Sequence, residues 1–108
     1  MEQRIENIKK ILDEKKAANI EVIDLKGDDY IVDCVIIATA LNAKHGASLL
    51  TYLKEDLKPF GEEFLRVEEE DGWTIIDLGD TFIHLMTQEY RDKYSIEDFL
   101  EDQKNKQD

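Results

Sequence analysis

The feature that most restricts the fold is a pair of apolar segments, residues 73–78 and 81–86, joined by Gly79-Asp80. A glycine at the first of two central loop positions indicates a type II′ β-hairpin, whose two-residue loop would pair Leu78 with Thr81. Because successive strand residues point to opposite faces, each hairpin face has its own side chains. One face carries Trp73, Ile75, Asp77, Phe82, His84 and Met86, and the other carries Thr74, Ile76, Leu78, Thr81, Ile83 and Leu85. Both sets are mainly apolar, so helices or a partner must cover both sides.

Helical and strand patterns alternate along the rest of the chain. Apolar residues spaced three or four apart predict helices. Runs of β-branched residues and uninterrupted apolar runs predict strands. Helices are expected over residues 5–18 and 43–58, strands over residues 20–25, 34–40 and 64–67, and short helices after residue 87. Asn42 is the candidate N-cap of the second helix. The acidic run at residues 68–72 is expected to be a solvated loop.

This order of elements predicts one domain of the α/β (α+β) class, with a mixed sheet of about five strands flanked by helices. A chain of 108 residues fits a single domain. We expect the folded domain to span residues 1–101. The polar residues 102–108 are expected to form a frayed C-terminal tail.

Charge and composition restrict the class of partner. The chain has 26 acidic and 14 basic side chains and a formal net charge of −12. Nucleic acids and anionic membranes bind clustered Lys and Arg, so neither is expected as the main partner. The acidity serves one of two purposes: it keeps the protein soluble, or it lets one acidic face bind a basic partner.

Cysteine content and apolar run length indicate the compartment. The one cysteine, Cys34, allows neither an internal disulfide nor a zinc site with several cysteines. The longest apolar run, residues 34–41, is far shorter than the ~20 residues that a membrane span needs. The first residues do not resemble a signal peptide. We therefore expect a cytoplasmic protein.

Few residues suggest catalysis. In the hairpin register, Asp77 and His84 are diagonal neighbours on one face, an arrangement that can orient a general base. No sequence motif places a nucleophile beside them, and Cys34 lies in a strand where a buried, unreactive thiol is typical. Asp28-Asp29 and Asp33 resemble the acidic pair of a nucleotidyltransferase, but no glycine-rich phosphate loop accompanies them. We expect no catalytic residue, metal or cofactor.

Trp73 is the most informative single residue. It is the only tryptophan, it follows the acidic run, and it begins the hairpin. A large aromatic residue at a strand end often packs into the core. Alternatively, Trp73 anchors an interface, because tryptophan is enriched among interface hot spots and an acidic rim would attract a basic partner.

Four segments in a fixed order resemble the ribosomal silencing factor family, also called RsfS or Iojap-related. They are the strand Asp33-Cys34-Val35-Ile36-Ile37-Ala38-Thr39, the hairpin from Trp73 through Asp77 and Gly79-Asp80, the strand Phe82-Ile83-His84-Leu85-Met86, and the ending with Arg91, Tyr94 and Glu97. The resemblance covers about residues 5–100. The chain departs from the family pattern at Ala40-Leu41-Asn42, at Glu69-Glu70 before the hairpin, and at Phe99-Leu100.

The resemblance implies a nucleotidyltransferase-like fold without enzymatic activity. It further implies binding to the large ribosomal subunit through ribosomal protein uL-fourteen. A protein bound there would block joining of the small subunit and repress translation under nutrient limitation. Because ribosomal proteins are basic, the acidity of this chain would be complementary to that partner.

We assign partner binding to residues on or beside the hairpin: Trp73, Asp77, Leu78, Asp80, Met86, Glu69 and Glu70. Trp73 and Met86 are expected as apolar anchors, the acidic residues are expected to meet basic groups, and His84 is expected to order the face together with Asp77. Asp33, His84, Arg91 and Tyr94 match family motifs as either interface or scaffold. The alternatives are a small metal-dependent nucleotidyltransferase-like enzyme and an adaptor for another basic protein. A homodimer is also possible.

Overall fold

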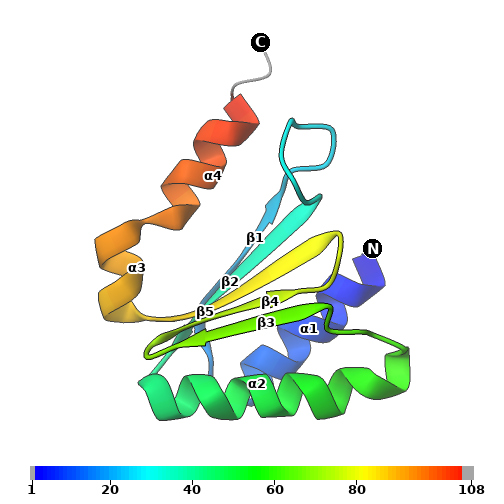
Figure 1. The fold of residues 1–108 in the computed structure, drawn as a ribbon, viewed down its shortest axis with the longest axis vertical. Coiled ribbons are helices and arrows are strands. Elements are labelled where there is room, and N and C mark those ends of the chain that lie inside the picture. The colour runs from blue at the N-terminus through cyan, green and yellow to red at the C-terminus, as the bar shows by residue number, and fades with distance from the viewer. Residues whose placement is uncertain (1, 106–108) are drawn as a thin grey trace.

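The strands form one five-stranded sheet in the order β1-β2-β5-β4-β3, and helices lie on both of its faces (Figure 1). The computed structural model describes residues 2–105. In chain order the elements are α1 (Glu2–Glu14), β1 (Ala18–Asp24), β2 (Cys34–Ala40), α2 (Ala43–Leu57), the 3-10 turn η1 (Lys58–Phe60), β3 (Arg66–Glu70), β4 (Trp73–Asp77), β5 (Thr81–Thr87), α3 (Gln88–Tyr94) and α4 (Ile96–Asn105). The expected fold class, a single mixed sheet of five strands with flanking helices, is confirmed.

The hairpin of β4 and β5 has the expected register. Ile76 pairs with Ile83 and Asp77 pairs with Phe82, and the backbone N–H of Leu78 donates to the carbonyl of Thr81 at 2.9 Å. Gly79 has a φ of +100°, as the first central position of a type II′ turn requires. The division of the hairpin side chains between two faces follows from this register.

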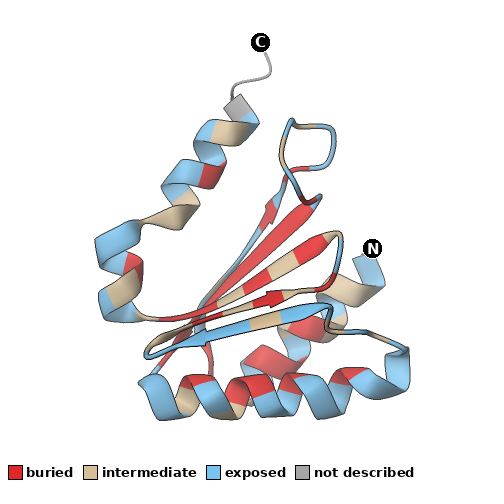
Figure 2. Ribbon diagram, in the orientation of Figure 1, coloured by how far each residue is buried: buried red, intermediate tan, exposed pale blue. Residues whose placement is uncertain are grey.

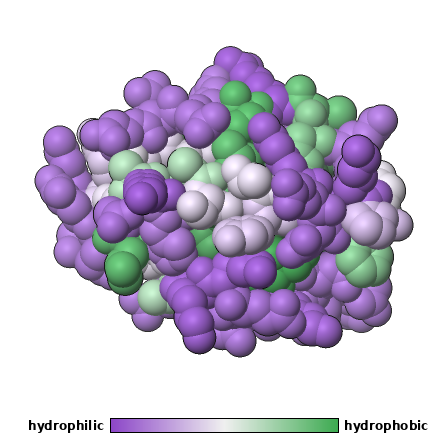
Figure 3. All heavy atoms as spheres, turned by 90° about the horizontal axis from the view of Figure 1, so that it is seen from below, coloured by the Kyte–Doolittle hydropathy of each residue, from purple (hydrophilic) through white to green (hydrophobic). Residues whose placement is uncertain are grey.

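The central strand β2 explains the apolar run at residues 34–40. It pairs in parallel with β5 and antiparallel with β1, and all seven of its residues are buried (Figure 2). On one side of the sheet, α1 and α2 pack over β2, β5 and β4 through Ile8, Leu12, Leu49, Leu53 and Leu57. Asn42 caps α2 as expected, because its side-chain oxygen accepts the backbone N–H of His45 at 2.8 Å. Seen from the side where α2 lies, the surface is mostly hydrophilic with separate hydrophobic patches (Figure 3).

The other side of the sheet is covered only in part. There α3 and α4 pack over β1, β2 and β5, and a smaller core forms around Ile23, Val35, Ile37 and Met86. Figure 1 shows that these two helices follow the β1–β2 half, and they leave β3 and all of β4 beyond Trp73 without a helix on that side. The smaller helical layer therefore creates an open sheet face.

Some boundaries differ from expectation. The strand expected at residues 64–67 lies at Arg66–Glu70, so most of the expected acidic loop is a strand paired with β4. The prediction of a loop was wrong because β4 supplies hydrogen-bonding partners that outweigh the low strand propensity of glutamate. Helix α4 continues to Asn105, past the expected domain end at residue 101, and residues 106–108 lie outside the described residues. Within residues 2–105, no helix has the length and apolar character of a membrane span.

Candidate functional site: an open face of the sheet

The uncovered side of β3, β4 and β5 forms a mixed apolar and charged surface, which we call the hairpin face. Strand pairing places Arg66 opposite Asp77, Glu68 opposite Ile75, and Glu70 opposite Trp73. With the neighbouring β5 residues, the hairpin face consists of Arg66, Glu68, Glu70, Trp73, Ile75, Asp77, Phe82 and His84. Its β4 and β5 members are partly exposed, and a shallow hollow of about 190 Å³ lies between Arg66, Ile75 and Phe82.

Trp73 is half-buried and belongs both to the second core and to the hairpin face. Its indole Nε1–H donates to Nδ1 of His84 at 3.0 Å. Its ring lies 5.1 Å from the ring of Tyr94 and 6.1 Å from that of Tyr90, between centroids. One side of the indole thus packs against α3 while the residue stays accessible from solvent. The core interpretation holds in part, and the interface role stays a prediction that the remaining exposure allows.

His84 is neutral in this environment. Burial lowers its pKa from 6.5 to about 4. An indole N–H can only donate, so Nδ1 of His84 must accept, and the ring proton of the neutral imidazole lies on Nε2. The hairpin face therefore presents a histidine whose tautomer is set by Trp73.

The expected pairing of His84 with Asp77 is not what the hydrogen bonds show. The carboxylate of Asp77 accepts the backbone N–H of Gly79 at 2.7 Å, while Nδ1 of His84 is used by Trp73. The turn after β4 presents an N–H within reach of a carboxylate two residues earlier, a local arrangement that aspartate adopts readily. Asp77 therefore stabilises the turn. The hydrogen bond between Trp73 and His84 orders the hairpin face instead.

Two residues assigned to partner binding are buried instead. Met86 is 0% exposed and packs in the second core, because α3 begins directly after β5 and covers this end of the strand. Leu78 is 7% exposed and packs on the opposite side of the sheet, with α1 and α2. In this structure neither can contact a partner, so these two assignments were wrong.

Asp80 and Asp33 lie at the turn end of the hairpin. Asp80 forms an ion pair with Arg4 of α1, and Arg4 also contacts Glu62 at 2.8 Å. The backbone N–H of Asp33 donates to the carbonyl of Asp80 at 2.9 Å, while the Asp33 side chain is exposed. Asp80 thus connects the hairpin turn to the N-terminal helix, which is a scaffold role.

Arg91 is also part of the scaffold. Its guanidinium is 6% exposed and donates to the carbonyl of Asn19 at 2.6 Å, to the hydroxyl of Thr39 at 2.8 Å, and to the carboxylate of Glu21 at 2.9 Å. These bonds join α3 to β1 and β2. Tyr94, three residues later, is 47% exposed beside Trp73 and can belong to an interface.

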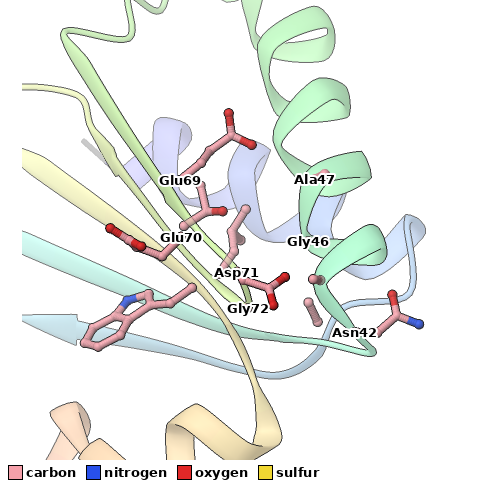
Figure 4. A pocket seen from close by; sticks show the side chains of 12 residues that line it. Asn42, Gly46, Ala47, Glu69, Glu70, Asp71 and Gly72 are labelled. Atoms are coloured by element: carbon pink, nitrogen blue, oxygen red, sulfur yellow. The ribbon is translucent and has the colours of Figure 1, made fainter.

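The acidic run divides between two surfaces. Strand alternation places Glu68 and Glu70 on the hairpin face and Glu69 on the side of α2. Glu69, Glu70 and Asp71 also line a pocket of about 200 Å³ between the β3–β4 turn and the start of α2, where the Asp71 side chain points toward the helix (Figure 4). A carboxylate near a helix N-terminus is favoured by the helix dipole. Only part of the run can therefore meet a partner docked on the hairpin face.

The assignment of partner-binding residues omitted two members of the face, Ile75 and Phe82. Both share the alternation of Trp73, so the same pattern could have found them. Cys34, in contrast, lies as expected, with 2% exposure and a pKa that burial and nearby carboxylates raise to about 11. Among residues 2–105, no group of three or more His, Cys, Asp or Glu side chains is placed to hold a metal ion.

Comparison with curated proteins finds relatives of this chain. The chain is 31% identical over 88 residues to the ribosomal silencing factor RsfS of Halalkalibacterium halodurans, covering 80% of this chain and 75% of that protein. It is 27% identical over 95 residues to RsfS of Haemophilus influenzae, covering 86% and 93%. It is also 30% identical over 91 residues to the chloroplastic protein Iojap of Arabidopsis thaliana, covering 83% of this chain and 38% of that protein.

Solved structures share the fold. A crystal structure of a Chromobacterium violaceum protein matches 92% of this chain and 84% of its own, with a TM-score of 0.85 at 24% identity. A Bacillus halodurans structure matches 92% and 94%, with a TM-score of 0.80 at 25% identity. The family described as "RsfS: Ribosomal silencing factor during starvation" matches residues 1–108. The chain therefore belongs to the ribosomal silencing factor family.

Proposed function

We propose that the chain binds the large ribosomal subunit through the hairpin face and thereby blocks joining of the small subunit. The contact on the subunit would be ribosomal protein uL-fourteen, and the result would be repression of translation during starvation. Membership of the ribosomal silencing factor family supports the role in silencing. The contact with uL-fourteen is what the resemblance of the sequence motifs to this family implies.

The observation that carries the proposal is the composition of the hairpin face. Its centre is a partly exposed group of apolar and aromatic side chains, Trp73, Ile75 and Phe82, of which Trp73 packs on one side against α3. Glu68 and Glu70 lie on the adjacent strand and are exposed. An apolar centre with a charged rim is the usual form of an interface, and an acidic rim attracts a basic partner.

This function is steric and needs no catalytic group. The family is one of ribosome-binding regulators without enzymatic activity, which argues against the alternative of a metal-dependent nucleotidyltransferase. Relatives include a mouse mitochondrial protein of large-subunit assembly and a chloroplastic protein, so related chains act in different compartments. For this chain we propose the cytoplasm.

The test is co-sedimentation of the full chain with purified large subunits, followed by a subunit association assay. Trp73→Ala is expected to weaken subunit binding at least about fivefold, because truncating an interface tryptophan removes about 1 kcal/mol or more of binding free energy. Phe60→Ala is the matched control, since Phe60 is an aromatic side chain with 61% exposure on η1, at the far end of α2.

A second variant addresses the case in which Trp73→Ala does not fold. Glu70→Lys changes an exposed rim charge and should reduce the association rate, most strongly at low salt, because it reverses a favourable long-range attraction. The proposal fails if the wild-type chain does not sediment with large subunits. It also fails if a folded Trp73→Ala chain and the Phe60→Ala control bind equally well.

A further inference from the structure

A second surface lies at the junction of α1 and α2. A groove of about 530 Å³ runs between the end of α1 and the first turns of α2. It is lined by Glu14, Lys15, Lys16, Leu41, Asn42, Lys44, His45, Ser48 and Tyr52, and we call it the lysine groove. None of the residues that form the hairpin face takes part in it.

The lysine groove has a fixed frame. Nδ1 of His45 accepts the backbone N–H of Leu41 at 2.8 Å, so Nε2 carries the proton and donates to the carbonyl of Lys15 at 2.8 Å. One imidazole thus holds the end of α1 against the β2–α2 loop. Lys16 has a φ of +71°, in the left-handed region that ends α1, and this turn fixes the direction in which the chain leaves the groove.

The charge of the lysine groove is opposite to that of the molecule. Three lysines and one glutamate line it, whereas the chain as a whole has 14 basic and 26 acidic residues. The groove also has an apolar component, because Leu41 is 84% exposed and Tyr52 is 39% exposed. The ammonium of Lys15 lies 4.3 Å from the centre of the Tyr52 ring.

This combination matches the chemistry of a nucleotide within a strand. Single-stranded nucleic acids bind where lysines contact the phosphates and an aromatic side chain stacks on a base. Leu41 and the side of the Tyr52 ring away from Lys15 provide an apolar surface for a base, and Lys15, Lys16 and Lys44 line the same groove with positive charge. An acidic peptide would satisfy the lysines, and it would use the apolar surface only if it also carried an apolar side chain.

The lysine groove lies on the same end of the molecule as Trp73. It shares Leu41 and Asn42 with a second hollow that reaches Gly72 and Tyr90, and both of these border Trp73. Acidic Asp71 and Glu89 line this intermediate hollow, so the positive charge is confined to the groove. A binding partner that covers Trp73 and extends across this end of the molecule would contact the acidic hollow first and the lysine groove beyond it.

We propose that the lysine groove binds the phosphate backbone and a base of ribosomal RNA when the hairpin face is docked on the large subunit. The inference rests on the proposed docking of the hairpin face. The RNA contact would then set the orientation of the bound protein, since two separated contacts fix a rotation that one contact leaves free. The acidity of the rest of the chain repels RNA elsewhere and restricts this contact to one place.

The experiment measures the affinity of the full chain for purified large subunits over a series of KCl concentrations. The test variant is Lys15→Gln/Lys16→Gln/Lys44→Gln. The matched control is Lys10→Gln/Lys54→Gln/Lys58→Gln, which makes the same change in net charge at exposed lysines outside the groove. The groove variant should bind at least about tenfold more weakly at low salt. The slope of log affinity against log salt should fall by about 2, since each phosphate contact contributes about 0.7.

Binding to isolated ribosomal protein uL-fourteen separates this proposal from the proposed function. The groove variant should bind that protein with the affinity of the wild-type chain, whereas Trp73→Ala should bind it more weakly. Equal subunit affinity and salt slope in the groove and control variants would overturn the RNA contact while leaving the hairpin face untouched. Weakened binding of the groove variant to isolated uL-fourteen would instead make the groove a protein contact. The proposal would also be overturned if the chain bound a free nucleotide such as ATP in the groove while replacing the three groove lysines left its affinity for large subunits unchanged.

Discussion

Arg91 shows how a motif residue can serve the scaffold and not the interface. The sequence motif was compatible with either an interface or a scaffold role for Arg91. Its burial and its hydrogen bonds to three acceptors indicate the scaffold role. An arginine so enclosed holds three elements together with one planar group, which lysine cannot reproduce.

Arg91→Ala should therefore lower the free energy of unfolding by about 3 kcal/mol, because the buried hydroxyl of Thr39 and the carbonyl of Asn19 lose their donor. Urea denaturation followed by circular dichroism measures the change. Lys93→Ala, an exposed change on the same helix, should shift the free energy by less than about 0.5 kcal/mol. Equal effects of the two changes would show that the Arg91 bonds contribute little.

The lowered pKa of His84 predicts a pH dependence of stability. Folding holds this pKa near 4, below the 6.5 of an ordinary histidine, so the unfolded chain takes up the proton first as the pH falls. His84 thus contributes stability that is complete above pH 6.5 and is lost progressively down to about pH 4. Denaturation midpoints of the wild-type chain and His84→Gln should converge over that range, since glutamine does not titrate. Midpoints that differ by a constant amount would contradict this assignment.

At the scale of elements, strong local patterns predicted most of the fold. The hairpin register followed from Gly79-Asp80, and the start of α2 followed from Asn42. The strand β3 was misplaced because its residues are mostly glutamates whose pairing depends on β4, and not on their own propensity. Met86 was misassigned for a related reason, because α3 covers the last part of β5 and alternation alone cannot show which part of a face a helix will cover.

The β3–β4 turn offers a test of close packing at a glycine. Gly72 has a φ of +94°, and a Cβ there would lie 2.8 Å from Cε2 of Tyr90. Gly27, with a φ of +86°, has open space at the same position. Gly27→Ala should cost about 1 kcal/mol of stability from backbone conformation alone. Gly72→Ala should cost about 2 kcal/mol and alter the fluorescence of Trp73, because Tyr90 must move. Equal losses without a spectral change would show that Tyr90 moves aside at no cost.

At the scale of the whole molecule, the charge of −12 is held within a radius of gyration of 13.2 Å. Like charges at such separations repel, and salt screens them. Raising KCl from about 10 mM to about 200 mM should therefore raise the melting temperature by a few degrees. Scanning calorimetry measures this shift, and sucrose at equal osmolality serves as the control. A melting temperature that falls with KCl would mean that the ion pairs of Arg4 and Arg91 outweigh the repulsion.

The parallel pairing of β2 with β5 has a consequence for synthesis of the chain. The first two strands and the last three are each built from neighbours in sequence, but the two groups meet only where residues 34–40 pair with residues 81–87. Contacts this distant in sequence form slowly, because a long loop must close before they are gained. A nascent chain therefore exposes an edge of its most apolar strand until β5 has left the ribosome, and the two halves can associate only then.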